Sequence, residues 1–169
     1  MERPEFIRHW VELEGPDDSH YKGDTELLSI GAPVGRLLGL TKLGIHHERL
    51  LPGRRTSYPH AESAEDEFIF VIEGHPDAWV DGHLHPLKPG DCIAFPSGTG
   101  IAHTFINNTP DEVRLLVVGE TNVPGAAIKY PLHPDVEKTR SDIWEDAPRH
   151  ALGPHDGLPD MLRAVKAKS

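Results

Sequence analysis

Short apolar runs separated by turn signals dominate residues 37–120 and limit this part of the chain to a β-rich fold. Turn signals such as Pro52-Gly53 and Pro89-Gly90 recur roughly every six to ten residues, a spacing typical of an antiparallel barrel or sandwich. Asp81-Gly82 predicts a type I′ hairpin turn, because both central residues of that turn need positive φ. The first strand is expected over Leu37–Leu51.

The run Glu67–Glu73 predicts a strand that is covered on both sides. Alternate residues of a strand point to opposite faces. One face begins with Glu67 and continues with apolar residues, and the other consists of Phe68, Phe70 and Ile72. A strand that is apolar on both faces needs a second layer or a second subunit outside it. We therefore expect a homodimer.

Four side chains form the candidate site, namely His60, Glu62, Glu67 and His103. His60 and Glu62 are two residues apart, so in a strand they share a face. Strand pairing in a small barrel would bring His103 to the same interior. Imidazole nitrogen and carboxylate oxygen are ligands for Zn, Mn, Fe or Ni. The alternative is a metal-free polar pocket in which these groups satisfy one another by hydrogen bonds.

Residues 53–74 (GRRTSYPHAESAEDEFIFVIEG) and 90–107 (GDCIAFPSGTGIAHTFIN) resemble the paired motifs of the cupin superfamily. One departure is Glu62, which stands where the family has its second His, and the spacings before His60 and His103 are also longer than the family's. The positions that match are Glu67, Gly74, Gly90, Pro96, Gly98, His103 and Asn107.

The resemblance implies an all-β fold, a cupin double-stranded β-helix or jelly-roll barrel over residues 37–120. Residues 1–36 would then form an N-terminal arm that packs on the barrel. Residues 121–169 would form an irregular C-terminal extension, with a short helix predicted by the apolar spacing of Pro159–Lys168.

The resemblance also implies a divalent metal bound by His60, Glu67 and His103, whereas Glu62 is a fourth candidate ligand by spacing alone. The expected chemistry is Lewis-acid or proton-transfer work on a small polar molecule, such as isomerisation of a sugar or sugar phosphate. Glu62 or Glu67 would act as the base. The alternatives are a metal-dependent dioxygenase and a non-catalytic binding or sensor protein. The fold alone does not distinguish these three functions.

Three further residues are candidates for contact with the substrate: Arg54, Tyr58 and Phe105. A guanidinium at Arg54 matches an anionic group, although a solvated charge at a strand edge is the alternative. Tyr58 lies close to His60 in sequence, so its phenol is a candidate to line the cavity. Phe105 is either a platform for the ligand or part of the wall.

The composition argues against several classes of partner. A formal net charge of −10 at pH 7 disfavours nucleic acid, whose phosphates would repel the chain. No apolar run approaches the 18 residues that suggest a membrane span. Residues 1–15 lack the apolar core of a signal peptide, and the single cysteine, Cys92, excludes an intrachain disulfide. We therefore expect a cytoplasmic protein with a small-molecule ligand, and a buried Cys92.

Overall fold

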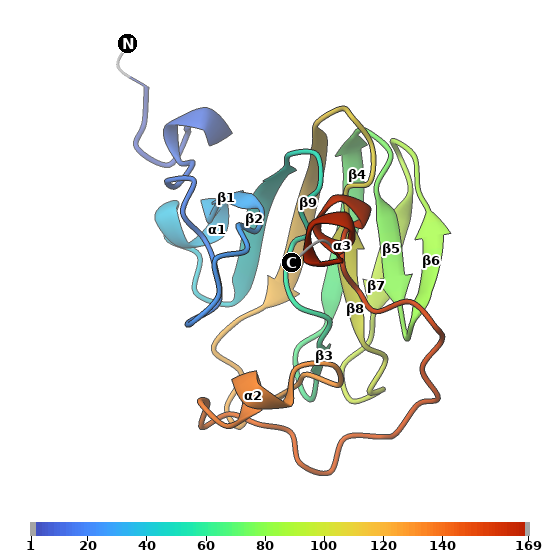
Figure 1. Cartoon of the computed structure of the whole chain (residues 1–169). Helices are drawn as coiled ribbons and strands as arrows, with labels where there is room; N and C mark the ends of the chain where they lie inside the picture. Colours follow the sequence, from blue (N-terminus) through green and yellow to red (C-terminus); the bar gives the residue numbers. More distant parts are fainter. Residues whose placement is uncertain (1–2, 168–169) are drawn as a thin grey trace.

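The structure, a computed structural model that describes residues 3–167, contains two main antiparallel sheets packed against each other (Figure 1). The strands are β1 (Ile30–Ala32), β2 (Leu43–Leu50), β3 (Ala61–Glu62), β4 (Glu67–Glu73), β5 (Asp77–Val80), β6 (His83–Pro86), β7 (Cys92–Phe95), β8 (His103–Ile106), β9 (Val113–Glu120) and β10 (Ile128–Lys129). The helical elements are η1 (Trp10–Glu12), α1 (Val34–Leu37), α2 (Pro134–Glu137) and α3 (Asp160–Lys166). The all-β prediction is confirmed.

The larger sheet has five strands in the order β1-β2-β9-β4-β7, and the smaller one has three in the order β6-β5-β8. β3 pairs with β10, and an isolated bridge between His60 and His103 joins the segment before β3 to β8. The hairpin between β5 and β6 turns at Asp81 (φ 45°) and Gly82 (φ 87°), the positive angles that the sequence predicts there.

The main core lies between the two sheets. Ile69 and Val71 of β4 are fully buried and belong to the same apolar cluster as Ala78 of β5 and Phe105 of β8. The alternation predicted for β4 is therefore correct on its inner face. On the outer face, Phe68 is 38% exposed.

Two local predictions are wrong. The segment that begins at Leu37 is not yet a strand, because the chain forms helix α1 and a turn before β2 starts at Leu43. Cys92 is exposed rather than buried. It pairs with Phe70 across β4 and β7 in the exposed region of the larger sheet, and a short apolar run does not show which of its residues face the core.

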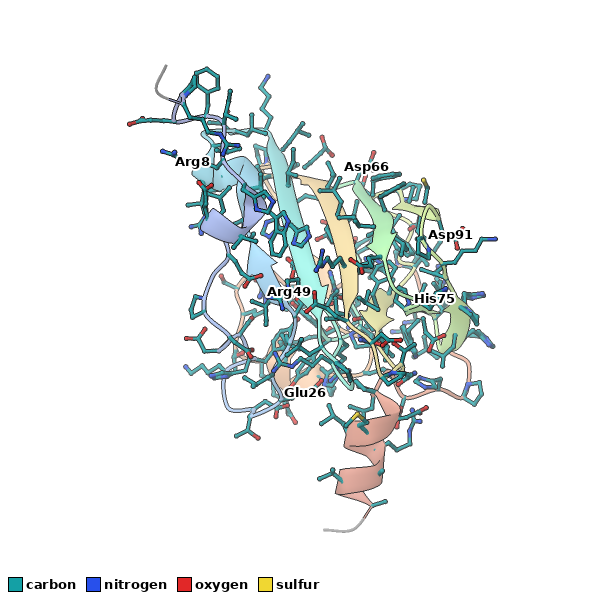
Figure 2. The ribbon with its side chains drawn as sticks, turned by 90° about the horizontal axis from the view of Figure 1, so that it is seen from above. Arg8, Glu26, Arg49, Asp66, His75 and Asp91 are labelled. Carbon is teal, nitrogen blue, oxygen red and sulfur yellow. The ribbon has the colours of Figure 1, made fainter. Side chains whose placement is uncertain are left out.

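The segment before β2 packs on the outside of the larger sheet. Trp10 stacks on His47 of β2 with 4.0 Å between ring centroids. Arg49 is held between two carboxylates, with its Nη1 2.9 Å from Glu14 Oε1 and its Nη2 2.6 Å from Glu112 Oε2. Figure 2 shows Arg49 toward the N-terminal segment, on the side away from Asp91 and His75.

The chain after β10 crosses the outside of the smaller sheet before it ends in α3 (Figure 1). Trp79 Nε1 donates to the carbonyl oxygen of His155 at 2.9 Å, and the Gly153 amide donates to the Asp81 carbonyl at 2.7 Å. A side chain at Gly82 would collide with the Gly153 backbone, so this glycine serves both the turn and the close approach of the tail. Helix α3 falls within the predicted range Pro159–Lys168, whose last residue lies outside the described residues.

Within residues 3–167, every helix is too short or too polar to cross a lipid bilayer.

Candidate functional site

A cavity of about 210 Å³, named here the central cavity, lies between the two sheets. One part of its wall is apolar and consists of Ile69, Phe105 and Val117. The rest is polar and consists of His46, Glu48, Thr56, Ser57, His60, Glu67 and His103. Three of the four residues predicted for the site, His60, Glu67 and His103, therefore meet in one cavity. Phe105 also lines this cavity.

His60 is fixed by its backbone and by its ring. Its amide and carbonyl exchange hydrogen bonds with those of His103, at 3.1 and 2.9 Å. The ring Nδ1 lies 2.9 Å from the carbonyl oxygen of Tyr58, which can only accept, so Nδ1 carries the hydrogen and Nε2 is left as an acceptor. Burial and the neighbouring His103 lower the pKa of His60 to about 4, so the ring is neutral near pH 7.

Glu67 and His103 form the closest polar pair in the cavity. His103 Nε2 lies 2.8 Å from Glu67 Oε2, and His103 Nδ1 lies 3.2 Å from the carbonyl oxygen of Ile101. The imidazole also stacks on Phe95, with 3.6 Å between ring centroids. Burial acts to raise the pKa of Glu67, but the hydrogen bond and charge of His103 hold it below its usual value. Glu67 is therefore a carboxylate at neutral pH.

The sequence does not single out His46 and Glu48 as cavity residues, although alternation along β2 predicts that at most one of His46 and His47 points inward. His46 is the one that does, while His47 lies under Trp10 on the outside. His46 Nδ1 lies 3.4 Å from Glu48 Oε1. Ser57 also lines the cavity and lies 3.2 Å from His60 Nδ1. A period of two residues in β2 is the signal that finds His46 and Glu48.

Glu62 does not line the central cavity. It lines a much smaller recess of about 10 Å³, which it shares with His103 and Phe95. Burial, followed by repulsion from Glu67, raises the pKa of Glu62 to about 8. A carboxyl group in this position is largely protonated at neutral pH and is a poor ligand or base for a molecule in the central cavity.

Arg54 and Tyr58 also lie outside the cavity lining. Arg54 pairs with Asp17 of the N-terminal segment and donates to the carbonyl oxygen of Leu28. The Tyr58 ring is sandwiched between Tyr21 and His133, at centroid distances of 3.9 and 3.8 Å, and its hydroxyl donates to Asp24. The structure thus turns both predicted substrate contacts toward the chain's own terminal segments.

The donors in the central cavity are of the right chemical kind for a divalent metal, with neutral imidazole and carboxylate at hand. Across residues 3–167, however, the side chains of His, Cys, Asp and Glu form no group of three or more that is placed to hold a metal ion. Glu67 is bonded to His103 instead, and the His60 and His103 ring centroids are 5.1 Å apart. The donor set fits a metal in kind but is not assembled around one.

The fold and the site define a small double-stranded β-helix protein with a polar cavity between its sheets. The profile of the cupin domain family matches residues 46–119, which run from β2 to β9. This match, over less than half of the chain, supports membership of the cupin superfamily.

Three known proteins show the range of the similarity. A structure of a sugar phosphate isomerase of the cupin superfamily from Silicibacter pomeroyi is 36% identical, with a TM-score of 0.58, over 60% of this chain and 64% of its own. The polyketide synthase CurC of Streptomyces cyaneus is 30% identical over 56% of each chain. The polyketide cyclase RemF of Streptomyces resistomycificus is 21% identical, with a TM-score of 0.59, over 78% of this chain and 85% of its own, which shows the fold alone.

The chain spans less than two thirds of the length of the first two of these relatives.

Proposed function

We propose that this chain binds a small polar carbonyl compound in the central cavity and catalyses proton transfer on it, as in the isomerisation of a sugar or sugar phosphate. The observation that carries the proposal is the Glu67–His103 pair, at 2.8 Å, in a cavity that also holds His60 and Ser57. The Silicibacter pomeroyi protein, a sugar phosphate isomerase by name, supports the same class of reaction.

Glu67 is the base in this proposal. Its lowered pKa keeps it ionised, so it can accept a proton from the carbon next to a carbonyl group. After exchange with solvent, Glu67 delivers a proton to the former carbonyl carbon, while the proton of the neighbouring hydroxyl passes to the carbonyl oxygen through His60 Nε2. His103 Nε2 faces the Glu67 carboxylate oxygen, an acceptor, so this nitrogen donates its hydrogen and orients the carboxylate. His60 Nε2 is free to accept a hydrogen bond from a substrate hydroxyl.

A second form of the proposal adds a divalent ion held by His60, Glu67 and His103. It is supported by the chemistry of these donors and by their positions in the cupin motifs. Such an ion would polarise the substrate carbonyl. With the ion bound, His60, Glu67 and His103 would be its ligands, so their hydrogen bonds to the substrate and to one another would be replaced by bonds to the ion.

A binding protein without catalysis is the second candidate function. It is favoured by the absence, within the described residues, of a ready-made group of three metal donors, because a sensor needs only a polar pocket. The dioxygenase alternative rests on the fold alone, and this fold hosts many activities.

The test is interconversion of aldoses and ketoses, free and phosphorylated, followed by NMR with the purified protein. We expect conversion of at least one pair and a loss of roughly 100-fold or more in Glu67→Gln, the scale of general-base catalysis. Glu73→Gln, at the exposed end of the same strand, is the matched control and should keep full activity. Tight binding without conversion would favour the sensor instead.

A further inference from the structure

Both carboxylates of the central cavity face a ligand-sized space, and the lining of that space includes no lysine or arginine among the described residues. Among the described residues that line it, the charged groups are Glu48 and Glu67, and the other ionisable groups are imidazoles. His46 contacts Glu48 and His103 contacts Glu67. Even a protonated imidazole in either pair is therefore neutralised by its own carboxylate, and the neutral His60 adds no charge.

The guanidinium groups closest in sequence to the cavity residues are committed elsewhere. Arg49, next to Glu48, pairs with Glu14 and Glu112. Arg55 is buried, donates to both oxygens of Glu26 at 2.6 and 2.8 Å, and donates to the carbonyl oxygen of Gly157 at 2.8 Å. Arg54 is held by Asp17 and by the carbonyl oxygen of Leu28. To turn any of them into the cavity would break an ion pair, and for Arg55 it would leave the buried Glu26 without its partner.

The lining of the central cavity lacks the groups that usually bind phosphate in proteins. Phosphate sites in proteins are built from arginine or lysine, or from backbone amides at a helix N-terminus or a glycine-rich turn. Here a phosphate dianion would lose water and meet carboxylates of the same sign. An uncharged hydroxyl compound meets no such penalty, because carboxylate, imidazole and Ser57 can bond its hydroxyls while Ile69, Phe105 and Val117 cover its C–H face.

We propose that the central cavity selects uncharged hydroxy-carbonyl compounds and rejects their phosphorylated forms, and that Glu48 is a residue that sets this selectivity. The inference rests on the proposed function and narrows its substrate class. It separates this chain from the phosphorylated substrates that the name of the Silicibacter pomeroyi relative specifies. Glu48 suits the role because it lines the cavity but does not contact Glu67 or His103 in the pairs described above.

The experiment compares the same sugars with and without a phosphate group, by calorimetry and by the NMR conversion assay. The protein is used as purified and again after dialysis against EDTA. We expect the free sugar to be preferred at least 10-fold in both preparations. A preference for the phosphorylated partner in either preparation overturns the inference and leaves the proposed function standing. If neither the free nor the phosphorylated sugar is bound or converted, the inference and the proposed function are both overturned.

Substitution of Glu48 supplies a second readout that does not depend on the sugar. Inorganic phosphate is titrated into the parent and into Glu48→Arg while the histidine ring signals are followed by NMR. In the parent we expect the NMR signals of the cavity histidines to stay unshifted at about 10 mM phosphate, a concentration at which weak millimolar binding would be detected. In Glu48→Arg we expect these signals to shift and to saturate as phosphate is added. Glu5→Arg adds the same charge on the exposed N-terminal segment and is the control.

Glu48→Gln tests the same point with a smaller change, should the arginine variant fold poorly. It should narrow the preference for the free sugar by several-fold. Phosphate shifts of equal size in the parent and in Glu48→Arg, or an unchanged preference in Glu48→Gln, would show that Glu48 does not set the selectivity.

Discussion

At the scale of single residues, His103 is the most constrained group of the site. Its backbone is bonded to His60, its ring lies on Phe95, and its two ring nitrogens face Glu67 and the carbonyl oxygen of Ile101. Contacts from so many directions fix the ring orientation before any ligand arrives. Such preorganisation is what a proton-transfer site needs.

Metal retention should depend on His103 and Glu67 more than on Glu62. The first two line the central cavity, whereas Glu62 faces a separate recess. We expect His103→Ala and Glu67→Ala to lose the metal on dialysis, and Glu62→Ala to lose no more than roughly 10- to 100-fold in affinity, the effect of a residue that acts through a ligand. Metal per chain after dialysis measures this. Full metal in the first two variants, or none in the parent, would show a polar pocket without a metal centre.

At the scale of elements, the N-terminal segment and the C-terminal tail form ion pairs and hydrogen bonds with the outside of the region from β2 to β9. Arg55 joins Glu26 of the N-terminal segment to Gly157 of the tail, and Arg49 joins Glu14 to Glu112. Arg49 lies in β2 next to the cavity residue Glu48, and Arg55 lies two residues before Ser57. These clamps therefore help to set the position of the cavity's polar wall.

The Arg49–Glu112 contact should make the free energy of unfolding decrease as the pH falls. The hydrogen bond from Arg49 lowers the pKa of Glu112 to about 2, so the contribution of this group is complete above the unfolded pKa near 4.5 and is lost as the pH falls toward 2. We expect Glu112→Gln to reduce the free energy of unfolding by about 1 kcal/mol at pH 7, a value discounted for partial exposure, and by less at pH 3.

Urea unfolding of the parent and of Glu112→Gln at the two pH values measures the difference. Glu12→Gln is the control, because Glu12 is 48% exposed and its contact with Arg3 is long, at 3.7 Å. A gap between parent and Glu112→Gln that is equal or larger at pH 3 would count against the clamp.

Helix α3 should be dispensable for folding, whereas the tail just before it should not. Met161 and Val165 of α3 are 60% and 65% exposed. We expect removal of residues 160–169 to lower the melting temperature by roughly 2–4 °C, the equivalent of about 1 kcal/mol for a chain of this size. Removal of residues 153–169 takes away the carbonyl acceptors of Trp79 and Arg55 and should lower it at least twice as far. Equal losses in calorimetry, or insoluble protein from the shorter deletion, would contradict this.

Local patterns predict the elements well where turn chemistry and alternation agree. The Asp81-Gly82 hairpin, the inner face of β4 and the helix near residue 160 are all found as predicted. The meeting of His60, Glu67 and His103 follows from the paired cupin motifs. By contrast, the position of Tyr58 against the terminal segments could not be predicted from the sequence. Its stacking partners, Tyr21 and His133, are remote from it in the chain.

At the scale of the whole molecule, the outer face of the larger sheet leaves an apolar area uncovered. Phe68 and Ile72 of β4 are 38% and 41% exposed, and Leu43 of β2 is 45% exposed. Exposed apolar residues that lie together on a sheet face are typical of an interface. The homodimer predicted from the sequence would cover this face with a second copy of the chain.

We expect a dimer by light scattering at micromolar concentration and a dissociation constant at least roughly 30-fold weaker in Phe68→Lys, the effect of losing an interface residue that contributes about 2 kcal/mol. Met161→Lys adds the same charge on the exposed side of α3 and should leave the dimer intact. A monomeric parent, or equal effects of the two substitutions, would reject this interface.

The most direct test of the account is deuterium incorporation during the reaction of a convertible sugar in D₂O, because it reports on the proton that Glu67 is proposed to move. We predict solvent deuterium at the carbon next to the carbonyl in the product formed by the parent. In Glu67→Gln this incorporation should fall by roughly 100-fold or more. Product without solvent deuterium, or unchanged incorporation in Glu67→Gln, would show that hydrogen moves by another route and would contradict the assignment of Glu67 as the base.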